Sequence, residues 1–257
     1  MPSIMNSKDG TASRGAGVMR RVNSIGLLLL AVLILAGCQE KPETAESVVQ
    51  KVIGAHGGAK AMRDAGGLLF HGQINALVEQ EQAKIWILFR KPLQLRVALE
   101  SEKFKEDRLF LDGQGWQNNG SGFFAVSGSA LAVMQFQAEH LSLPFRLLER
   151  QYEVVMPNEV VADQPVVLML KDAEGIETKV SVDPVKWFVR AVERDFEIRG
   201  AMTRFSVVYE DYRTVKGLQL PFRISNYING QAVGRTDFVS VQTNPSLPEK
   251  IFSAPGK

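Results

Sequence analysis

The octapeptide LQLRVALE, residues 93–100, carries a large apolar side chain at every second position. These apolar residues are Leu93, Leu95, Val97 and Leu99. Successive side chains of a β-strand point to opposite faces of a sheet, so the octapeptide predicts a strand with one dry face and one wet face. The preceding stretch IWILF, residues 85–89, is apolar on both faces. It predicts a strand covered from both sides, with a further element such as a helix lying over it.

A period of two begins at Leu68 and returns along most of the chain. Asp112-Gly113 and Asn229-Gly230 are hairpin signals, because both central positions of the tightest turns adopt positive φ. Short turns without alternating strands and helices predict an antiparallel meander of roughly ten strands. Beyond the two strands above, the expected strands are 107–112, 115–119, 152–156, 166–171, 177–182, 187–196, 203–212, 218–228 and 233–242.

Helical spacing is found in two places. The first helix is ended by Gly57-Gly58 and followed by a short second piece at 59–64. Its apolar face consists of Ala45, Val48, Val49, Val52 and Ile53. Helical spacing returns between Gly128 and Gln151, where Pro144 must break or kink it. This insertion follows a flexible loop with an exposed-looking Phe123-Phe124. It is either a plug that stabilises the concave side of the sheet or a movable lid over an apolar cavity.

The N-terminal region has the order of a secretory signal. Met19-Arg20-Arg21 is followed by an apolar run at 25–36, which as a helix is roughly 18 Å long, too short for a bilayer core of about 30 Å. We expect residues 1–37 to be a signal peptide. Residues before Met19 add nothing to it, so Met19 is the expected start, with Met1 and Met5 as alternatives.

The chain has a single cysteine, directly behind this apolar run. The sequence LAGC at 35–38 resembles the bacterial lipobox, in which the thiol receives a diacylglycerol and the cysteine becomes the acylated N-terminus. Cys38 is therefore the expected lipid attachment site, since two or three acyl chains anchor a protein firmly. By resemblance to the enterobacterial sorting rule, Gln39 rather than Asp behind the cysteine favours the outer membrane. The alternative is an ordinary secretory signal that happens to carry a cysteine.

Composition argues against several classes of function. One cysteine closes no intramolecular disulfide and builds no cysteine metal cluster. The leader holds much of the basic excess, so the remaining near-neutral chain lacks the footprint of a nucleic-acid binder. His56, His71 and His140 have no metal-binding spacing, and no G-x-S-x-G nucleophile motif is present. We expect no catalytic activity, no cofactor and no metal.

Several segments, in this order, resemble the LolA/LolB-like outer-membrane lipoprotein-sorting proteins. They are HGG (56–58), DGQGW (112–116), VDPVKWFVRAV (182–192), YEDYRTVKGLQLPFRI (209–224) and VQTNPSLPEKIFSAP (241–255). The resemblance runs from about Thr44 to Pro255. It implies an α+β, mainly β fold: a curved antiparallel half-barrel sheet with helices over its concave face, whose interior holds acyl chains.

The carrier members of this family are soluble, whereas this chain carries a predicted anchor. That difference favours an acceptor of lipoproteins, supplied by a protein carrier, or a lipid-handling protein fixed at one membrane. We expect residues 38–257 to form a single lipid-anchored periplasmic domain. The alternative is a non-catalytic interaction or sensor module on the same fold, with a filled interior and an apolar surface patch.

The alternation also predicts which residues line the cavity. Ordinary core packing is the alternative for each of them. They are Leu93, Leu95, Val97, Leu99, Leu109, Leu111, Met134, Leu141, Val180, Val182, Phe222 and Ile224.

Overall fold

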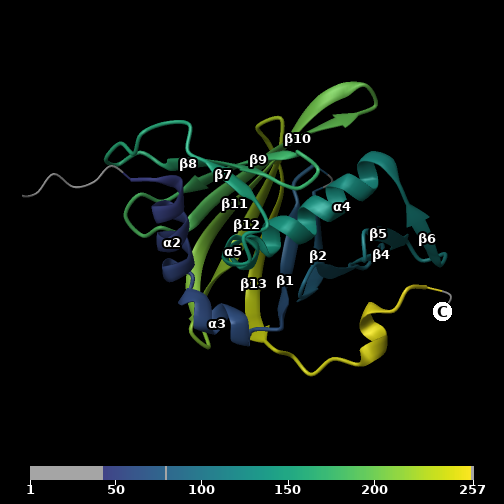
Figure 1. Cartoon of the computed structure of the whole chain (residues 1–257). Coiled ribbons are helices and arrows are strands. Elements are labelled where there is room, and N and C mark those ends of the chain that lie inside the picture. Colours follow the sequence, from purple (N-terminus) through teal and green to yellow (C-terminus); the bar gives the residue numbers. More distant parts are fainter. Residues whose placement is uncertain (1–42, 79, 256–257) are drawn as a thin grey trace, which may run out of the picture. The chain divides into compact units, whose positions relative to one another are not determined.

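A computed structural model describes residues 43–78 and 80–255. They form one compact unit built on a 13-stranded antiparallel sheet (Figure 1). The predicted signal peptide, its alternative starts and Cys38 lie outside the described residues. The 13-stranded sheet confirms the predicted fold, which is mainly β with a curved, open antiparallel sheet.

Neighbouring strands of the sheet follow the order β6-β5-β4-β3-β2-β1-β13-β12-β11-β10-β9-β8-β7, so the first and last strands, β1 and β13, pair in the middle. The first six strands are β1 (Gly67–Ala76), β2 (Glu81–Arg90), β3 (Gln94–Glu100), β4 (Lys105–Leu111), β5 (Gln114–Asn118) and β6 (Phe123–Val126). The remaining strands are β7 (Glu153–Val155), β8 (Val166–Lys171), β9 (Glu177–Val182), β10 (Val189–Ile198), β11 (Ala201–Val215), β12 (Leu218–Ile228) and β13 (Gln231–Thr243).

The sequence prediction covers eleven of the thirteen strands of the described residues; the region of β1 was indicated only by the period of two that begins at Leu68, and β6 was omitted. Both expected tight turns are present, with positive φ at Asp112, Gly113, Asn229 and Gly230. The Phe123-Phe124 pair, expected in an exposed loop, instead begins the edge strand β6, which pairs with β5. The omission arose because the Gly/Ser-rich residues before it contain turn signals and hide the short alternation.

Within the described residues the helical segments are α2 (Ala45–Ala55), α3 (Gly58–Asp64), α4 (Gly128–Leu141), α5 (Leu143–Leu148) and the 3-10 helix η1 (Glu249–Phe252). Thr44 caps α2 by accepting a hydrogen bond from the Ser47 amide on its side-chain oxygen, and the Thr44 amide donates in return to Ser47 Oγ. Gly57 separates α2 from α3 with φ at 113°, and a Cβ there would lie 2.2 Å from the Gly217 carbonyl oxygen. A glycine is required at this close approach.

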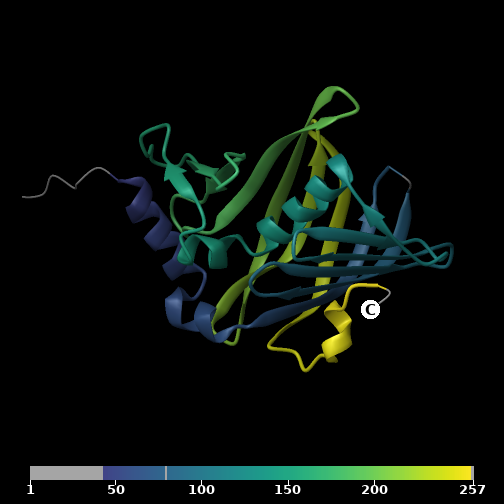
Figure 2. The ribbon, with the colours of Figure 1, turned by 45° about the vertical axis from the view of Figure 1, so that its right-hand side comes forward.

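The predicted break at Pro144 is present, because Pro144 lies in the first turn of α5 and Ser142 separates α5 from α4. Together α4 and α5 connect β6 to β7, the two outermost strands. Figures 1 and 2 show these helices running across the concave face of the sheet. The connection between the two edges is therefore also the cover of that face.

The concave face holds the main core. Leu95 pairs with Phe89 of β2 on one side and with Phe110 of β4 on the other, and all three side chains are buried. Phe89 stacks on Phe145 of α5, with ring centroids 6.1 Å apart. Val97 belongs to the same core and is fully buried.

The convex face holds a smaller cluster of Leu88, Leu109 and Phe252, the last from η1. Arg96 of β3 donates a hydrogen bond to the Ile251 carbonyl and pairs with Asp107, which fixes the C-terminal segment against the sheet. The stretch 85–89 is therefore covered on both sides, as predicted. Its outer cover is the short 3-10 helix.

Candidate functional site

The larger of two cavities under the helices lies between α4 and strands β1, β2 and β11–β13, with a volume of about 190 Å³. Helix α4 contributes Val133, Phe136, Gln137, His140 and Leu141. The apolar lining from the strands is Ile74, Ile85, Ile87, Phe205, Val207, Tyr227, Ile224, Ile228, Val233 and Phe238. The cavity is thus an apolar space between a helix and a sheet, where ligand pockets commonly form.

One wall of this cavity is polar. Arg108 of β4 reaches it, with a guanidinium nitrogen 3.5 Å from the Gln137 side-chain oxygen of α4. Glu106 on the same strand lies 3.0 Å from Arg108 Nε. Ser206, Asn226 and Thr236 complete the polar lining. A guest of this cavity would therefore meet apolar side chains along most of its surface and a cation at one side.

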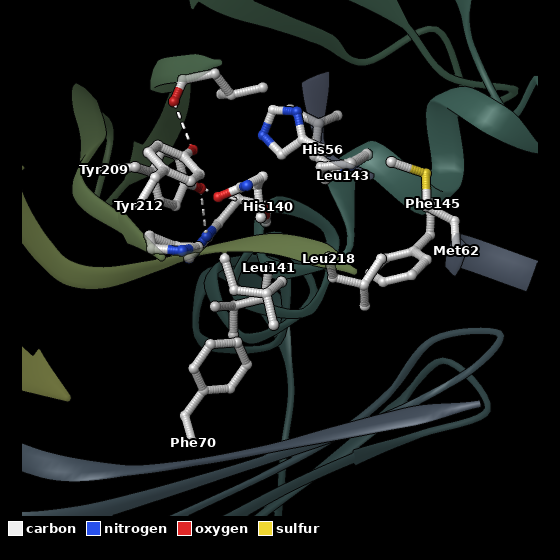
Figure 3. A pocket seen from close by; sticks show the side chains of 15 residues that line it. His56, Met62, Phe70, His140, Leu141, Leu143, Phe145, Tyr209, Tyr212 and Leu218 are labelled. Atoms are coloured by element: carbon white, nitrogen blue, oxygen red, sulfur yellow. Dashed lines mark hydrogen bonds between the residues drawn. The ribbon is translucent and has the colours of Figure 1, made fainter. Parts of the chain in front are cut away.

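The smaller cavity, about 30 Å³, lies at the junction of α2, α3, α5 and strands β11 and β12 (Figure 3). His140 and Leu141 line both cavities, so the two are neighbours along the concave face. The apolar lining is Met62, Phe70, Leu143, Pro144, Phe145, Val189, Leu218, Leu220 and Pro221. The other polar side chains are His56, Tyr209, Tyr212 and Gln219.

A buried ion pair fastens α4 to the sheet. Arg194 of β10 donates from Nη2 to Glu139 Oε2 at 2.6 Å, and both side chains are almost fully buried. Arg194 Nε also donates to Thr178 Oγ1 at 2.9 Å, and Gln135 donates to the second Glu139 oxygen at 2.9 Å. These hydrogen bonds satisfy the two buried charges, which a pair in this environment requires. They fix the C-terminal half of α4 over β9 and β10.

A second polar contact lies one residue further along α4. The Tyr209 hydroxyl is 2.8 Å from His140 Nδ1 and donates to the His140 carbonyl at 3.2 Å. Burial, helped by the charge of Arg194, lowers the pKa of His140 from 6.5 to about 3. Burial also raises the pKa of Tyr209. Both side chains are therefore neutral at pH 7.

His56 lies at the C-terminus of α2 and is 4 % exposed. Its Nδ1 lies 2.9 Å from the Val52 carbonyl oxygen, one helical turn back. The ring meets Phe188 and Tyr212 edge-on, with centroids 5.6 Å and 5.5 Å away. Burial lowers the pKa of His56 to about 4, and the hydrogen bond to Val52 offsets part of that effect. Within the described residues Nε2 has no hydrogen-bond partner.

The structure brings most of the predicted cavity residues to the concave face. Two of them line a cavity: Leu141 lines both and Ile224 lines the larger one. Leu93 packs against the core and is partly buried. The others are buried in the core without lining either cavity: Leu95, Val97, Leu99, Met134, Val180, Val182 and Phe222.

Leu109 and Leu111 are on the wrong face for the expected cavity. Phe110 pairs with Leu95 on the concave side, so Leu109 and Leu111 point to the convex face and join the cluster with Phe252. The sequence has three consecutive apolar residues at this point, and alternation alone cannot select which of them face inward. The register with β3 places Phe110 there instead.

The polar residues of the site were not singled out from the sequence. Glu139 and Arg194 lie 55 positions apart, and no local pattern connects them. His56 was interpreted only as part of a helix end. The one sequence signal available was the position of Arg194 in the apolar phase of its strand, between Val192 and Phe196, where a charged residue needs a buried partner.

Among residues 43–78 and 80–255, no three His, Cys, Asp or Glu side chains are placed to hold a metal ion. No helix of that part of the chain is long and apolar enough to cross a membrane. Around the two cavities the polar side chains offer hydrogen bonds and the rest of the lining offers apolar contact.

Sequence comparison matches no family model and no curated protein. Among the solved structures that share the fold, three are aligned over most of both chains. A LolA superfamily protein from Nitrosomonas europaea has a TM-score of 0.54 and 16% identity over 82% of this chain and 98% of its own. A DUF1329 family protein from Desulfovibrio piger has a TM-score of 0.57 and 8% identity over the same shares, 82% and 98%.

The third structure is a putative outer membrane lipoprotein-sorting protein domain from Vibrio parahaemolyticus. Its TM-score is 0.53, with 11% identity over 81% of this chain and 95% of its own. Identities this low establish the architecture alone. The chain has the fold of the LolA superfamily and of outer-membrane lipoprotein-sorting domains.

Proposed function

We propose that this protein binds acyl chains of lipoproteins or lipids between α4 and the concave face of its sheet. The observation that carries the proposal is the mainly apolar cavity of about 190 Å³ lined by α4 and six strands. A sheet with an apolar inner face either packs a core or lines a pocket for an apolar guest. Here the core fills the two flanks, and a space remains under Val133 and Phe136 that a guest could occupy.

The location follows from the N-terminal sequence. A lipid on Cys38 would tether the domain to a membrane through its first residue, with the outer membrane favoured by Gln39. A tethered acyl-binding domain facing the periplasm suits the sorting or transfer of lipoproteins or lipids. A carrier protein would then deliver the acyl chains, and this chain would receive them. Catalysis has no part in this proposal.

A second candidate is a non-catalytic interaction or sensor module. Its supporting observation is volume, because ligand pockets usually measure about 300–1,000 Å³ and the larger cavity has about 190 Å³. On that reading the helices fill the concave face for stability. The acyl-binding proposal requires instead that the N-terminal half of α4 yield, where Ser129 and Ala130 are exposed and Val133 is half-buried.

The two candidates separate when the cavity is filled by a side chain. Val133→Trp places an indole in the larger cavity, and Ala130→Trp places the same group at an exposed position in the first turn of the same helix, outside the cavity lining. We expect Val133→Trp to weaken binding of dansylaminoundecanoic acid at least about tenfold without lowering the unfolding midpoint, because a guest and the indole compete for one space. Ala130→Trp should bind like the wild type. Fluorescence titration measures both.

Mass spectrometry of lipid that copurifies with the wild type supplies the identity of the guest. Lipid or an acylated peptide in stoichiometric amount, absent from Val133→Trp, would support the proposal. A wild type that carries no lipid and does not bind the probe would contradict acyl binding and favour the interaction module.

A further inference from the structure

The hydrogen bond of His56 determines which of its ring nitrogens carries the proton. A carbonyl oxygen only accepts, so His56 Nδ1, 2.9 Å from the Val52 oxygen, must be the protonated nitrogen. Because burial holds the pKa of His56 at about 4, the ring is neutral at pH 7. In a neutral imidazole the second nitrogen has a lone pair and no hydrogen. Nε2 is therefore a hydrogen-bond acceptor.

This acceptor is buried and finds no donor among the described residues. Figure 3 shows the ring at the wall of the smaller cavity, close to Tyr212 and Leu143. The neighbouring hydroxyls are engaged elsewhere: Tyr212 donates to the Val189 carbonyl at 2.7 Å, and Tyr209 is bonded to His140. Buried polar atoms of native proteins nearly always have a partner. The missing partner of Nε2 must come from outside this set of side chains.

We propose that the smaller cavity is a subsite for the donor group of an apolar ligand, a hydroxyl or an amide N–H, which donates to His56 Nε2. The inference rests on the proposed function and deepens it by naming the chemistry of the guest. About 30 Å³ is room for a group of one or two heavy atoms, not for a chain. The chain itself would lie in the larger cavity, which shares His140 and Leu141 with this one.

The subsite distinguishes ligands by whether they donate or accept a hydrogen bond. An ether or an ester oxygen only accepts, so it would oppose the lone pair of Nε2 and leave both atoms unsatisfied. An alcohol or an amide would satisfy the nitrogen. A water molecule is a poorer occupant, because a buried water normally makes about three hydrogen bonds and the other walls here are mainly apolar.

Two probes test the subsite, one with a hydroxyl that can donate a hydrogen bond and one with an ether oxygen that can only accept. The full chain with Cys38→Ser, which removes the predicted acylation site, is titrated with 1-dodecanol and with dodecyl methyl ether against a bound dansyl acyl probe. We expect the alcohol to bind about fivefold more tightly than the ether, the size of one net hydrogen bond. The same protein with His56→Phe, which keeps an aromatic ring against Phe188 and Tyr212, should show no preference.

His71→Phe is the matched control, because His71 stacks on Trp86 on the convex face and should leave the preference intact. If His56→Phe does not fold, ring ¹⁵N spectra of the wild type provide the answer, since the chain has three histidines. The Nε2 resonance of His56 should shift with the alcohol and stay unchanged with the ether.

The outcomes separate the two proposals. Equal affinity for both probes, or a preference that persists in His56→Phe, overturns the subsite and leaves acyl binding standing. If neither ligand displaces the dansyl acyl probe, the subsite is overturned and acyl binding stands, whereas a chain that does not bind the dansyl acyl probe at all overturns both.

Discussion

The concave and convex faces of the sheet handle charge in opposite ways. On the concave face Arg194 is buried and is neutralised by Glu139 of α4 at 2.6 Å. One residue along the same strand, Asp195 points to the convex face and pairs with Arg204 at 2.8 Å, with both side chains largely exposed. The comparison shows that alternation along one strand places equivalent ion pairs in two environments, where the energetic consequences of breaking them differ.

The faces also differ in their covers. The concave face is covered by a connection between the two outermost strands, α4 and α5, and it retains two cavities. The convex face carries a local cover, η1, over a small cluster around Leu109. Helices α4 and α5 link the two edges of the sheet, whereas η1 covers only a small apolar patch. Substitutions on each face test this difference between the two covers.

The largest effect is expected from Arg194→Leu, which leaves the Glu139 carboxylate buried and unpaired. The free energy of unfolding should fall by about 3–5 kcal/mol, measured by urea denaturation. The double variant with Glu139→Leu should recover most of the loss, since no buried charge remains. Arg204→Leu on the convex face is the matched control and should be close to the wild type. Equal losses from the two arginines would remove the contrast between the faces.

Lowering the pH tests the two buried histidines of the concave face through the stability of the fold. His56 and His140 have folded-state pKa values of about 4 and about 3, below the 6.5 of the unfolded chain. The unfolded chain therefore binds these protons more readily, so stability is lost as the pH falls below about 6.5. For His56 alone the loss should reach about 3 kcal/mol near pH 4.

The measurement is the free energy of unfolding against pH for the wild type and His56→Phe. The variant should lose less stability between pH 6.5 and 4, by the proton that His56 no longer takes up on unfolding. His71→Phe serves as the control and should follow the wild type. Parallel curves for all three proteins would show that the His56 ring is not held neutral by burial.

The smallest effect is expected on the convex face. Phe252→Ala removes a buried ring from the cluster with Leu88 and from under the guanidinium of Arg90, 4.5 Å from its centroid. We expect a loss of about 2 kcal/mol, less than for a central phenylalanine, because the C-terminal segment can detach locally. Affinity for the acyl probe should not change, since neither cavity is touched. A weakened affinity would mean that the two faces are coupled.

Much of the fold could be predicted because most strands and helices follow from local sequence patterns. The ranges of β8 and β9 agree with the alternation, and Pro144 marks the start of α5. The pairing of β1 with β13 has no local signal, since these strands lie at opposite ends of the described chain. It depends on how the finished sheet buries its surface.

The site was less predictable for a related reason. Alternation identified the apolar face but could not choose between Leu109 and Phe110, whose direction is decided by pairing with β3. The contact of Glu139 with Arg194 and the isolated Nε2 of His56 depend on elements that meet only in the folded chain. Apolar periodicity predicts where a cavity forms, whereas its polar groups follow from tertiary packing.

The two outermost strands, β6 and β7, have 4 and 3 residues. An open sheet normally exposes unpaired backbone at both margins, which invites edge-to-edge association with other chains. Margins this short offer a neighbouring chain only a few hydrogen bonds. The sheet can therefore remain open around its helices without becoming a template for aggregation in a crowded compartment.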